Sequence, residues 1–218
     1  MLTDFNLWYL TTNWKHYSTK FKLRDKVVIE NKTTGAYCDI GKYGDDLIIA
    51  FKGTELKLND IISDILFSKK VYPYGNFESK IKVHQGFICQ YKSIRDDIQH
   101  HLATTDYDKV YVIGHSLGGA LATLCIVDLD YTFAYSLLSL EDDLHGRIFG
   151  SPRVGNRAFT KSFNKRLKNF KNYQVKNDTV TKLPLKIMGF SHVKDVIKLG
   201  KLRWWFPFGG HLNYYKYL

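Results

Sequence analysis

A glycine-flanked serine constrains the fold of this chain more than any other feature of its 218 residues. Ser116 stands in the run GHSLG (114–118), after a β-branched and aromatic stretch at 109–113 and before an apolar stretch, 117–130, that is typical of a helix. A strand, a tight turn with room only for glycines and a helix together form a nucleophile elbow, which exposes a serine hydroxyl above a sheet. We therefore predict a nucleophile at Ser116. The alternative is a glycine turn that contains a serine by coincidence.

Two hydrophobic periods alternate along the chain and predict a single α/β domain over residues 1–218. Strands that alternate with helices favour a mostly parallel sheet covered by helices on both faces. No linker, internal repeat or low-complexity run interrupts the pattern. The expected helices are 5–17, 86–102, 117–130 and the basic 156–170, and the expected strands are 34–40, 46–51 (joined to the previous one by the turn 41–45), 109–113, 147–151, 173–177 and 193–199.

A serine nucleophile needs a general base, and behind an elbow of this kind the base follows both the serine and the acid in the chain. His145 precedes the best acid, and His192 opens an expected strand, so both are interpreted as exposed structural histidines. His211 follows two glycines in a loop near the C-terminus, from which an imidazole can reach the elbow. We predict His211 as the base, with a satisfied surface histidine as the alternative. Upstream histidines are excluded by this order: His16, His84, His100 and His101.

The base in turn needs an acid that orients it. Asp178 ends the expected strand 173–177, at the carboxyl edge of the sheet where α/β sites are built. Its alternative role is to cap or close a turn before Thr179. Asp195, within a strand pattern, is the second candidate. The other downstream acids lie on the helix after the elbow or in a solvated charge run: Asp128, Asp130, Glu141, Asp142 and Asp143.

Acyl transfer also needs hydrogen-bond donors aimed at the oxyanion that develops on the substrate. The backbone N–H of Leu117, at the start of the helix, is one candidate. Thr54 is the second, because the buried strand 48–51 runs into Lys52-Gly53-Thr54 and a threonine offers both an N–H and a hydroxyl. A plain strand-ending turn is the alternative for this segment.

The net charge of +11 is unevenly distributed. Residues 1–143 contain 16 Lys and Arg against 19 Asp and Glu, whereas residues 144–218 contain 16 against two, Asp178 and Asp195. Such a basic half attracts phospholipid head groups, nucleic acid or an acidic partner. No nucleic-acid-binding motif accompanies it, so we expect no nucleic acid and favour an anionic membrane surface. Lysines that merely solvate a helix explain part of the excess.

The N-terminal residues and the cysteines predict the compartment. Residues 1–10 carry an early acid, Asp4, and no basic region before a sustained apolar core, which is unlike a signal peptide. Cys38, Cys89 and Cys125 cannot all pair, and each stands among apolar or aromatic residues, as reduced core thiols do. We therefore expect an intracellular protein with neither disulfides nor a transmembrane segment.

Several segments share an order with one known family. They are residues 51–54 (FKGT), 59–65 (NDIISDI), 83–87 (VHQGF), 114–122 (GHSLGGALA), 149–156 (FGSPRVGN), 177–180 (NDTV) with 183–184 (LP), and 211–215 (HLNYY). Through these segments, which are spread over most of its length, the chain resembles the class 3, or fungal-type, lipases of the α/β-hydrolase fold. Their common order makes a coincidental match negligible.

This resemblance implies an α/β-hydrolase fold, the triad Ser116, Asp178 and His211, and an oxyanion hole of Thr54 and Leu117. It also implies a short helical lid at 55–67, which covers the serine and swings aside at a lipid surface. A helix fixed on the sheet is the alternative for this segment. Its apolar residues fall at i, i+3, i+4, i+7 and i+8, on one helical stripe: Leu58, Ile61, Ile62, Ile65 and Leu66.

The residues and the resemblance together predict a serine esterase that hydrolyses lipid carboxyl esters, either acylglycerol or phospholipid, without metal or cofactor. A carboxylesterase for soluble esters and a lipid-binding pseudoenzyme of the same fold are the alternatives. Secreted relatives carry a signal peptide and disulfides that this chain lacks, so an internal membrane lipid is the expected substrate. The basic and aromatic stretch 201–208 (KLRWWFPF) is either an interfacial anchor or a core-packing loop.

Overall fold

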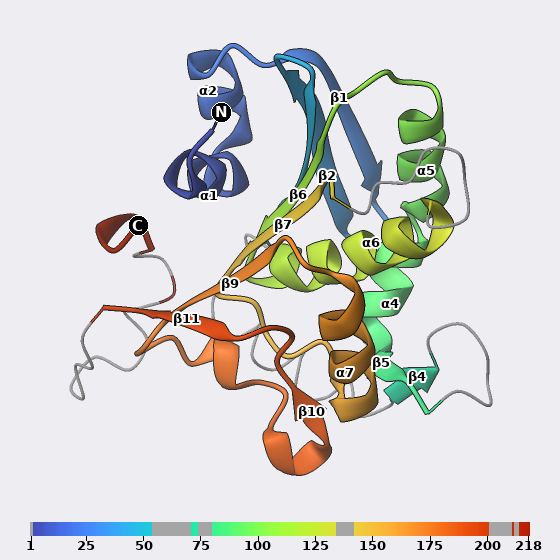
Figure 1. Cartoon of the computed structure of the whole chain (residues 1–218), viewed down its shortest axis with the longest axis vertical. Coiled ribbons are helices and arrows are strands. Elements are labelled where there is room, and N and C mark those ends of the chain that lie inside the picture. The colour runs from blue at the N-terminus through green and yellow to red at the C-terminus, as the bar shows by residue number, and fades with distance from the viewer. Residues whose placement is uncertain (1, 54–70, 74–79, 134–141, 201–210, 212–213) are drawn as a thin grey trace.

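The computed structural model describes residues 2–53, 71–73, 80–133, 142–200, 211 and 214–218. Within these residues, seven strands form the main sheet in the order β1-β2-β3-β6-β7-β9-β11 (Figure 1). The strands from β3 to β11 run parallel, and β1 and β2 join antiparallel at one edge. The predicted mostly parallel sheet is thereby confirmed. Its strands are β1 Arg24–Asn31, β2 Ala36–Tyr43, β3 Asp46–Phe51, β6 Val110–His115, β7 Leu144–Phe149, β9 Phe170–Val175 and β11 Val196–Leu199.

Helices cover both faces of this sheet, as predicted (Figure 1). Successive strand residues point to opposite faces, so Ile48 of β3 packs with the N-terminal helices while Ile49 packs on the other side. Both faces of the central strands are therefore buried. One face is covered by α1 (Asp4–Thr12) and α2 (Trp14–Lys20), and the other by α4 (Gln85–Lys92), α5 (Arg95–Ala103), α6 (Leu117–Phe133) and α7 (Arg157–Arg166).

A second, four-stranded sheet has the order β10-β8-β5-β4 in the described part of the chain. Its strands β5 and β8 lead directly into α4 and α7, so this sheet fixes where both helices begin. Strands of two or three residues leave no hydrophobic period in the sequence, which is why this sheet was not predicted. The strands are β4 Val71–Pro73, β5 Lys82–His84, β8 Gly155–Asn156 and β10 Phe190–Ser191.

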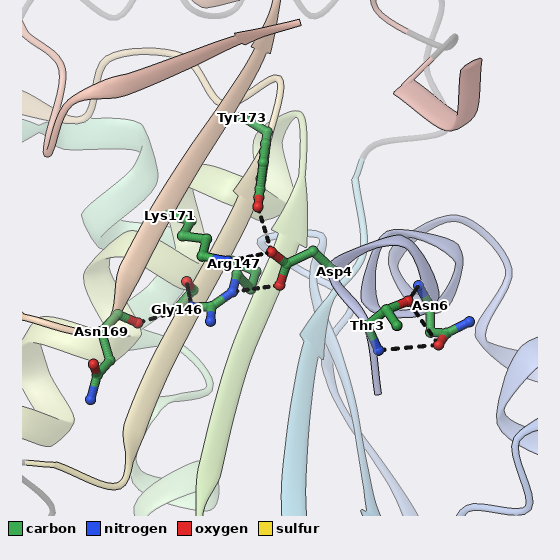
Figure 2. Close-up of polar contacts among 8 residues, drawn as sticks. All are labelled: Thr3, Asp4, Asn6, Gly146, Arg147, Asn169, Lys171 and Tyr173. Atoms are coloured by element: carbon green, nitrogen blue, oxygen red, sulfur yellow. Dashed lines mark hydrogen bonds and ion pairs between the residues drawn. The ribbon is translucent and has the colours of Figure 1, made fainter. Parts of the chain in front are cut away.

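A carboxylate at the start of α1 fastens that helix to the parallel strands. Asp4 accepts hydrogen bonds from Arg147 Nε at 2.7 Å, from Lys171 Nζ at 2.7 Å and from the Tyr173 hydroxyl (Figure 2). Arg147 belongs to β7, and the other two belong to β9. Burial alone raises the pKa of Asp4, but the hydrogen bonds from Lys171 and Tyr173 and the charge of Arg147 outweigh burial and leave this pKa below its ordinary value.

Two of the expected helices are each divided into two shorter ones. The expected helix 5–17 breaks at Asn13, whose side chain caps α2 by accepting a hydrogen bond from His16 N at 3.2 Å. The expected helix 86–102 breaks between α4 and α5, where the Ser93 hydroxyl donates a hydrogen bond to the backbone oxygen of Gln90 at 2.7 Å. Such side chains compete with the backbone for hydrogen bonds, and a hydrophobic repeat does not reveal that competition.

The sequence reasoning also missed β1 and displaced several boundaries. Only Ile29 is buried in β1, so no alternation of apolar residues marks this edge strand. β2 continues to Tyr43, which shortens the turn before β3 to Gly44 and Asp45. The expected strands 147–151, 173–177 and 193–199 and the expected helix 156–170 are observed as β7, β9, β11 and α7, with ends displaced by up to four residues.

The most apolar helix, α6, packs within the core. Leu121, Leu124 and Ile126 are each at most 1% exposed, because α6 lies directly against the central strands. In the described part of the chain, no helix combines the length and the apolar character that crossing a bilayer requires.

Candidate active site

The elbow forms where the sequence predicts it, between β6 and α6. β6 ends at His115, α6 begins at Leu117, and Ser116 between them has a φ of 57°, a left-handed conformation that side-chain-bearing residues rarely adopt. The flanking glycines permit this turn. A Cβ on Gly114 would lie 2.1 Å from the oxygen of Gly118, and a Cβ on Gly118 would lie 2.2 Å from the oxygen of Phe51.

Ser116 is more buried than the prediction of an exposed hydroxyl allows. Its backbone N–H donates to the oxygen of Phe149 at 3.0 Å, which ties the turn to the end of β7. The residue is 3% exposed, and its Oγ has no hydrogen-bond partner among the described residues. A buried polar atom without a partner is uncommon, and a catalytic role is one of the explanations for such an atom.

Asp178 and His211 lie 33 residues apart in the chain and meet in the structure. The His211 Nδ1 is 2.9 Å from Asp178 Oδ2, and the two side chains are 3% and 0% exposed. Asp178 follows β9, at the carboxyl ends of the parallel strands. Its other oxygen, Oδ1, accepts a hydrogen bond from the Val180 N–H at 3.0 Å, so the turn after β9 also fixes the carboxylate. These contacts set the direction of the imidazole.

Tyr214 supplies a third donor to the same carboxylate. Its hydroxyl donates to Asp178 Oδ2 at 2.7 Å and accepts a hydrogen bond from the Val175 N–H at 3.1 Å. Tyr214 is fully buried, and burial raises its pKa, with the nearby Asp178 charge acting in the same direction. The phenol therefore stays protonated and remains a donor. Its bond to Val175 links the carboxylate to the end of β9.

Gly150 allows the end of β7 to lie close to the Asp178–His211 pair. It follows β7, with a φ of 60°, and a Cβ there would lie 2.8 Å from Asp178 Oδ2 and 3.2 Å from His211 Nδ1. Any side chain at this position would push the acid and the imidazole apart. Gly150 therefore makes room for the contact.

His115, the residue before Ser116, contacts His211 and so connects the proposed base to the elbow. Its Nε2 lies 2.8 Å from the backbone oxygen of His211, and because a carbonyl can only accept, Nε2 is the donor. The two rings are 4.6 Å apart. Burial and then the charge of His211 lower the pKa of His115 to about 3, so this ring stays neutral at neutral pH. The residue before the elbow serine thus holds the backbone of His211.

His211 Nε2 is buried and has no hydrogen-bond partner in the part of the chain that the structure describes. The same is true of Ser116 Oγ. These are the two atoms between which a proton would pass in a serine hydrolase. Asp178 therefore satisfies Nδ1 of the His211 imidazole, whereas Nε2 and the serine hydroxyl have no partner among the described residues.

The other candidates stand in different surroundings. Asp195 is exposed before β11. His145 and His192 are partly buried, so their interpretation as exposed histidines is wrong: His145 stacks on Tyr111 with ring centroids 4.8 Å apart, and His192 Nε2 lies 2.7 Å from the Thr181 oxygen. Asp128 and Asp130 instead form ion pairs, at 2.8 Å with Arg95 and at 2.5 Å with Arg166.

The structure describes only part of the proposed oxyanion hole and none of the segment 55–67. Leu117 begins α6, which places its N–H at a helix N-terminus. A Cβ on Gly53 would lie 3.0 Å from the His115 oxygen and 3.5 Å from Ser116 Cβ, so the segment after β3 approaches the elbow closely. Thr54 lies outside the described residues, as do the lid 55–67 with Leu58, Ile61, Ile62, Ile65 and Leu66, and the stretch 201–208.

Three residues that sequence reasoning did not single out shape this site: His115, Gly150 and Tyr214. His115 stood inside the elbow motif, and Tyr214 stood in the segment 211–215, so short motifs did mark both positions without giving their contacts. Gly150 stood in the segment 149–156 and was expected inside the strand 147–151, but it follows the observed β7 and has a positive φ. Among the described residues, no group of three His, Cys, Asp or Glu side chains is arranged to hold a metal ion.

Comparison with known proteins identifies the family. Residues 48–188 match the class 3 lipase family, a segment that contains Ser116 and Asp178 and ends before His211. A secreted mono- and diacylglycerol lipase A from Penicillium cyclopium is 32% identical over 164 residues, which cover 73% of this chain and 50% of the relative. A lipase from Rhizomucor miehei is 33% identical over 157 residues, 68% of this chain and 40% of the relative. The chain belongs to the class 3 lipase family, as its motifs predicted.

The fold agrees with this assignment. A triacylglycerol lipase whose catalytic centre is described as a serine protease triad matches with a TM-score of 0.75 at 24% identity, over 87% of this chain and 72% of its own. The predicted fold is thereby confirmed. The chain spans about half the length of the curated relatives it matches.

The expectation of an intracellular protein is wrong. The relative from Penicillium cyclopium is named a secreted lipase, and this finding removes the basis for an internal membrane lipid as the substrate. The cysteines misled the prediction, because a chain of this size buries enough core to be stable without disulfides in any compartment. Cys38 and Cys125 are buried as expected, but Cys89 is exposed and is not a core thiol.

Proposed function

We propose that this chain is a serine esterase that hydrolyses the carboxyl esters of lipids through an acyl-enzyme intermediate. The observation that carries the proposal is the buried Asp178–His211 pair, 2.9 Å apart, beside an elbow that holds Ser116 in a left-handed turn. An acid, an imidazole and a serine in this relation are the parts that make a hydroxyl nucleophilic at neutral pH. Membership of the class 3 lipase family supports the same reaction.

In the proposed mechanism, Ser116 Oγ attacks the ester carbonyl while His211 Nε2 accepts its proton. The imidazolium then protonates the alcohol that leaves. Asp178 accepts the Nδ1 hydrogen bond, which keeps Nε2 free to act as the base and stabilises the imidazolium. A water molecule activated by His211 then cleaves the acyl-enzyme and releases the fatty acid. We assign oxyanion stabilisation to the backbone N–H groups of Leu117 and Thr54.

The proposed substrate is an acylglycerol or a phospholipid. One relative is named a mono- and diacylglycerol lipase, and the matched solved structure is a triacylglycerol lipase, which supports a glycerol ester. The basic half of the chain, residues 144–218, supports peripheral binding to an anionic lipid surface. Hydrolysis of soluble esters is the first alternative. A lipid-binding pseudoenzyme is the second, and the contact between Asp178 and His211 argues against it.

Titration of released fatty acid from matched tri-, di- and monoacylglycerols and phospholipids tests the proposal. We expect turnover of at least one of these esters, a loss of about 10⁴-fold or more in Ser116→Ala, and a loss of roughly 10³ to 10⁴-fold in Asp178→Asn. Asp195→Asn is the matched control and keeps the parent rate. Loss in Asp195→Asn but not in Asp178→Asn would show that the acid is misassigned. No rise in rate as the substrate passes its micellar threshold would favour a soluble-ester enzyme.

We also propose that the segment 55–67 is a lid over Ser116. Its apolar stripe supports a helix with one face that covers the site when closed and contacts lipid when open. Exposing that stripe to water costs roughly 25 cal/mol per Å², so opening is favoured at a lipid surface. Replacing Ile61 and Ile62 together by serine should reduce the difference in rate between emulsified and dissolved ester. An unchanged difference would leave the segment as fixed scaffold.

A further inference from the structure

The turn η2 (Lys186–Met188) carries an apolar side chain that stands almost wholly in water. Ile187 is 92% exposed, the largest value for any large apolar residue in the described part of the chain, and Leu185 beside it is 45% exposed. Figure 1 shows this turn projecting at the lower end of the molecule, just before β10. A single exposed apolar residue is common on protein surfaces, so its support and its surroundings decide what it means.

The backbone of this turn is fixed. The Met188 N–H donates to the Leu185 oxygen at 3.0 Å, and the Gly189 N–H donates to the Lys186 oxygen at 2.9 Å. Gly189, with a φ of 87°, ends the turn, and the next residue pairs through β10 with β8. Ile187 is therefore held outward by an ordered turn.

Basic groups surround the turn. Lys182 precedes the turn, Lys186 is its first residue, and both lysines are exposed. Lys198 of β11 lies near them: burial lowers its pKa, and the charges of Lys182, Arg153 and Lys186 lower it further. Asp178 is the one acid among the causes of this shift, and it is buried, at 0% exposure. Two exposed apolar side chains among several cations match the composition of membrane-surface anchors.

We propose that Leu185 and Ile187 insert into an anionic lipid surface while Lys182 and Lys186 contact its head groups. This inference rests on the proposed function for its choice of a lipid partner. Charge complementarity selects an anionic lipid over a neutral one, because the turn is cationic. The source of the surface is the bilayer or emulsion that contains the substrate.

The same segment connects this anchor to the active site. Asp178 and the turn are separated by η1 (Val180–Lys182) and Pro184, and the Arg153 guanidinium donates to the oxygen of Lys182 and, at 2.6 Å, to the oxygen of Pro184. The Arg153 N–H also donates to the Leu183 oxygen at 2.6 Å. Arg153 thus fastens the connecting residues. Docking through Ile187 would hold the acid, and with it the active site, at a fixed place relative to the lipid surface.

Flotation with vesicles of ether-linked phospholipids tests the anchor without hydrolysis, because these lipids contain no carboxyl ester. One set is neutral phosphatidylcholine, and the other contains anionic phosphatidylglycerol. The test variants are Ile187→Ser and Lys186→Glu. The matched controls stand at the other edge of the sheet: Val28→Ser replaces a residue that is 53% exposed on β1, and Lys32→Glu replaces a lysine whose side chain is 89% exposed. Circular dichroism and thermal unfolding verify that every variant is folded.

We expect the parent to bind anionic vesicles more tightly than neutral ones, and more weakly as salt rises. Ile187→Ser should lower the partition coefficient about tenfold on anionic vesicles. Lys186→Glu should lower it by about tenfold on anionic vesicles and little on neutral ones. The controls should bind like the parent. Binding by both test variants that equals the parent's, or equal losses in the controls, would overturn the proposal.

Two further readouts separate the alternatives. Sedimentation of the free protein detects a second copy seated on the turn, so a dimer that Ile187→Ser dissociates would overturn the lipid assignment. Turnover of a short, soluble ester should be the same in parent and test variants. Absence of turnover of every acylglycerol and phospholipid by the parent, with the vesicle results as expected, would support the anchor and contradict the proposed function.

Discussion

The Tyr214 hydroxyl donates a 2.7 Å hydrogen bond to Oδ2 of Asp178, the same oxygen that lies 2.9 Å from His211 Nδ1. The phenol and the imidazole therefore share one carboxylate oxygen, and the Val180 N–H occupies the other. All of these groups are buried, so the orientation of the imidazole depends on the whole set of donors. Tyr214 does not carry the proposed reaction; it positions the acid.

Tyr214→Phe should therefore reduce turnover without abolishing it. The substitution removes one donor from Asp178 and leaves the Val175 N–H without its acceptor, which we expect to lower the free energy of unfolding by about 1–3 kcal/mol. We expect kcat on a soluble ester to fall about tenfold, which corresponds to a rise of roughly 1.4 kcal/mol in the activation free energy when the acid is less well oriented. KM should stay unchanged because Tyr214 touches no substrate. Tyr215→Phe, at a residue 43% exposed, is the control. An unaltered kcat would mean that Tyr214 only fills space.

Asp4→Asn should loosen the N-terminal helix from the sheet. The amide removes the negative charge that Arg147 and Lys171 contact, and Arg147, whose side chain is 12% exposed, loses its ion pair with Asp4 (Figure 2). We expect the free energy of unfolding at pH 7 to fall by roughly 1–3 kcal/mol. Because the folded pKa of Asp4 is lowered, its contribution is present above the unfolded value and is lost as pH falls through the folded one.

Denaturant unfolding of Asp4→Asn and the parent across pH measures this effect. The difference between them should be largest near neutral pH and should shrink below about pH 4. Asp45→Asn, at an exposed acid in the turn before β3, is the control. A difference that does not change with pH would assign the loss to packing of α1 and not to the ionised carboxylate.

Asp39→Asn should change the pH dependence of the free energy of unfolding in the sense opposite to Asp4→Asn. Burial raises the pKa of Asp39 to about 6, and the hydrogen bond from Tyr37 and the charge of Lys52 offset burial only in part. The folded protein therefore binds a proton that the unfolded chain releases. This contribution to stability is complete below the unfolded pKa and is lost as pH rises through about 6.

The parent should thus lose stability relative to Asp39→Asn between pH 4 and pH 7, by an amount on the order of 2 kcal/mol. Urea titrations of both proteins at these two pH values measure it. An equal difference in the free energy of unfolding between the two proteins at both pH values would contradict the raised pKa of Asp39.

The sequence predicted the central strands and the elbow because their signals are local. Residues 110–113 are apolar on both faces, and the glycines of GHSLG favour a tight turn, so β6, Ser116 and α6 followed from adjacent residues. The edge strand β1 gave no such signal, because an edge strand with one buried residue needs no apolar alternation. Helix breaks at Asn13 and Ser93 depend on side-chain hydrogen bonds that periodicity does not contain.

Elimination by chain order brought Asp178 and His211 forward as partners, and the structure places them in contact. The order of the residues in the chain does not reveal the contacts that hold these two side chains. The Tyr214 hydroxyl, the space at Gly150 and the His115 ring become relevant only after the strand ends have been brought together in the fold. Burial of His192 was missed for the same reason, since its contact with the Thr181 oxygen forms only in the fold.

Labelling with a fluorophosphonate probe tests most directly whether Ser116, with His211 and Asp178 behind it, is an activated nucleophile. Intact-protein mass spectrometry counts the probe, and peptide mapping locates it. We predict one probe per parent chain, on Ser116, no probe on Ser116→Ala, and labelling of Asp178→Asn that is slower by roughly 10³-fold. Stoichiometric labelling of a residue other than Ser116, or labelling of Asp178→Asn at the parent rate, would contradict the proposed triad.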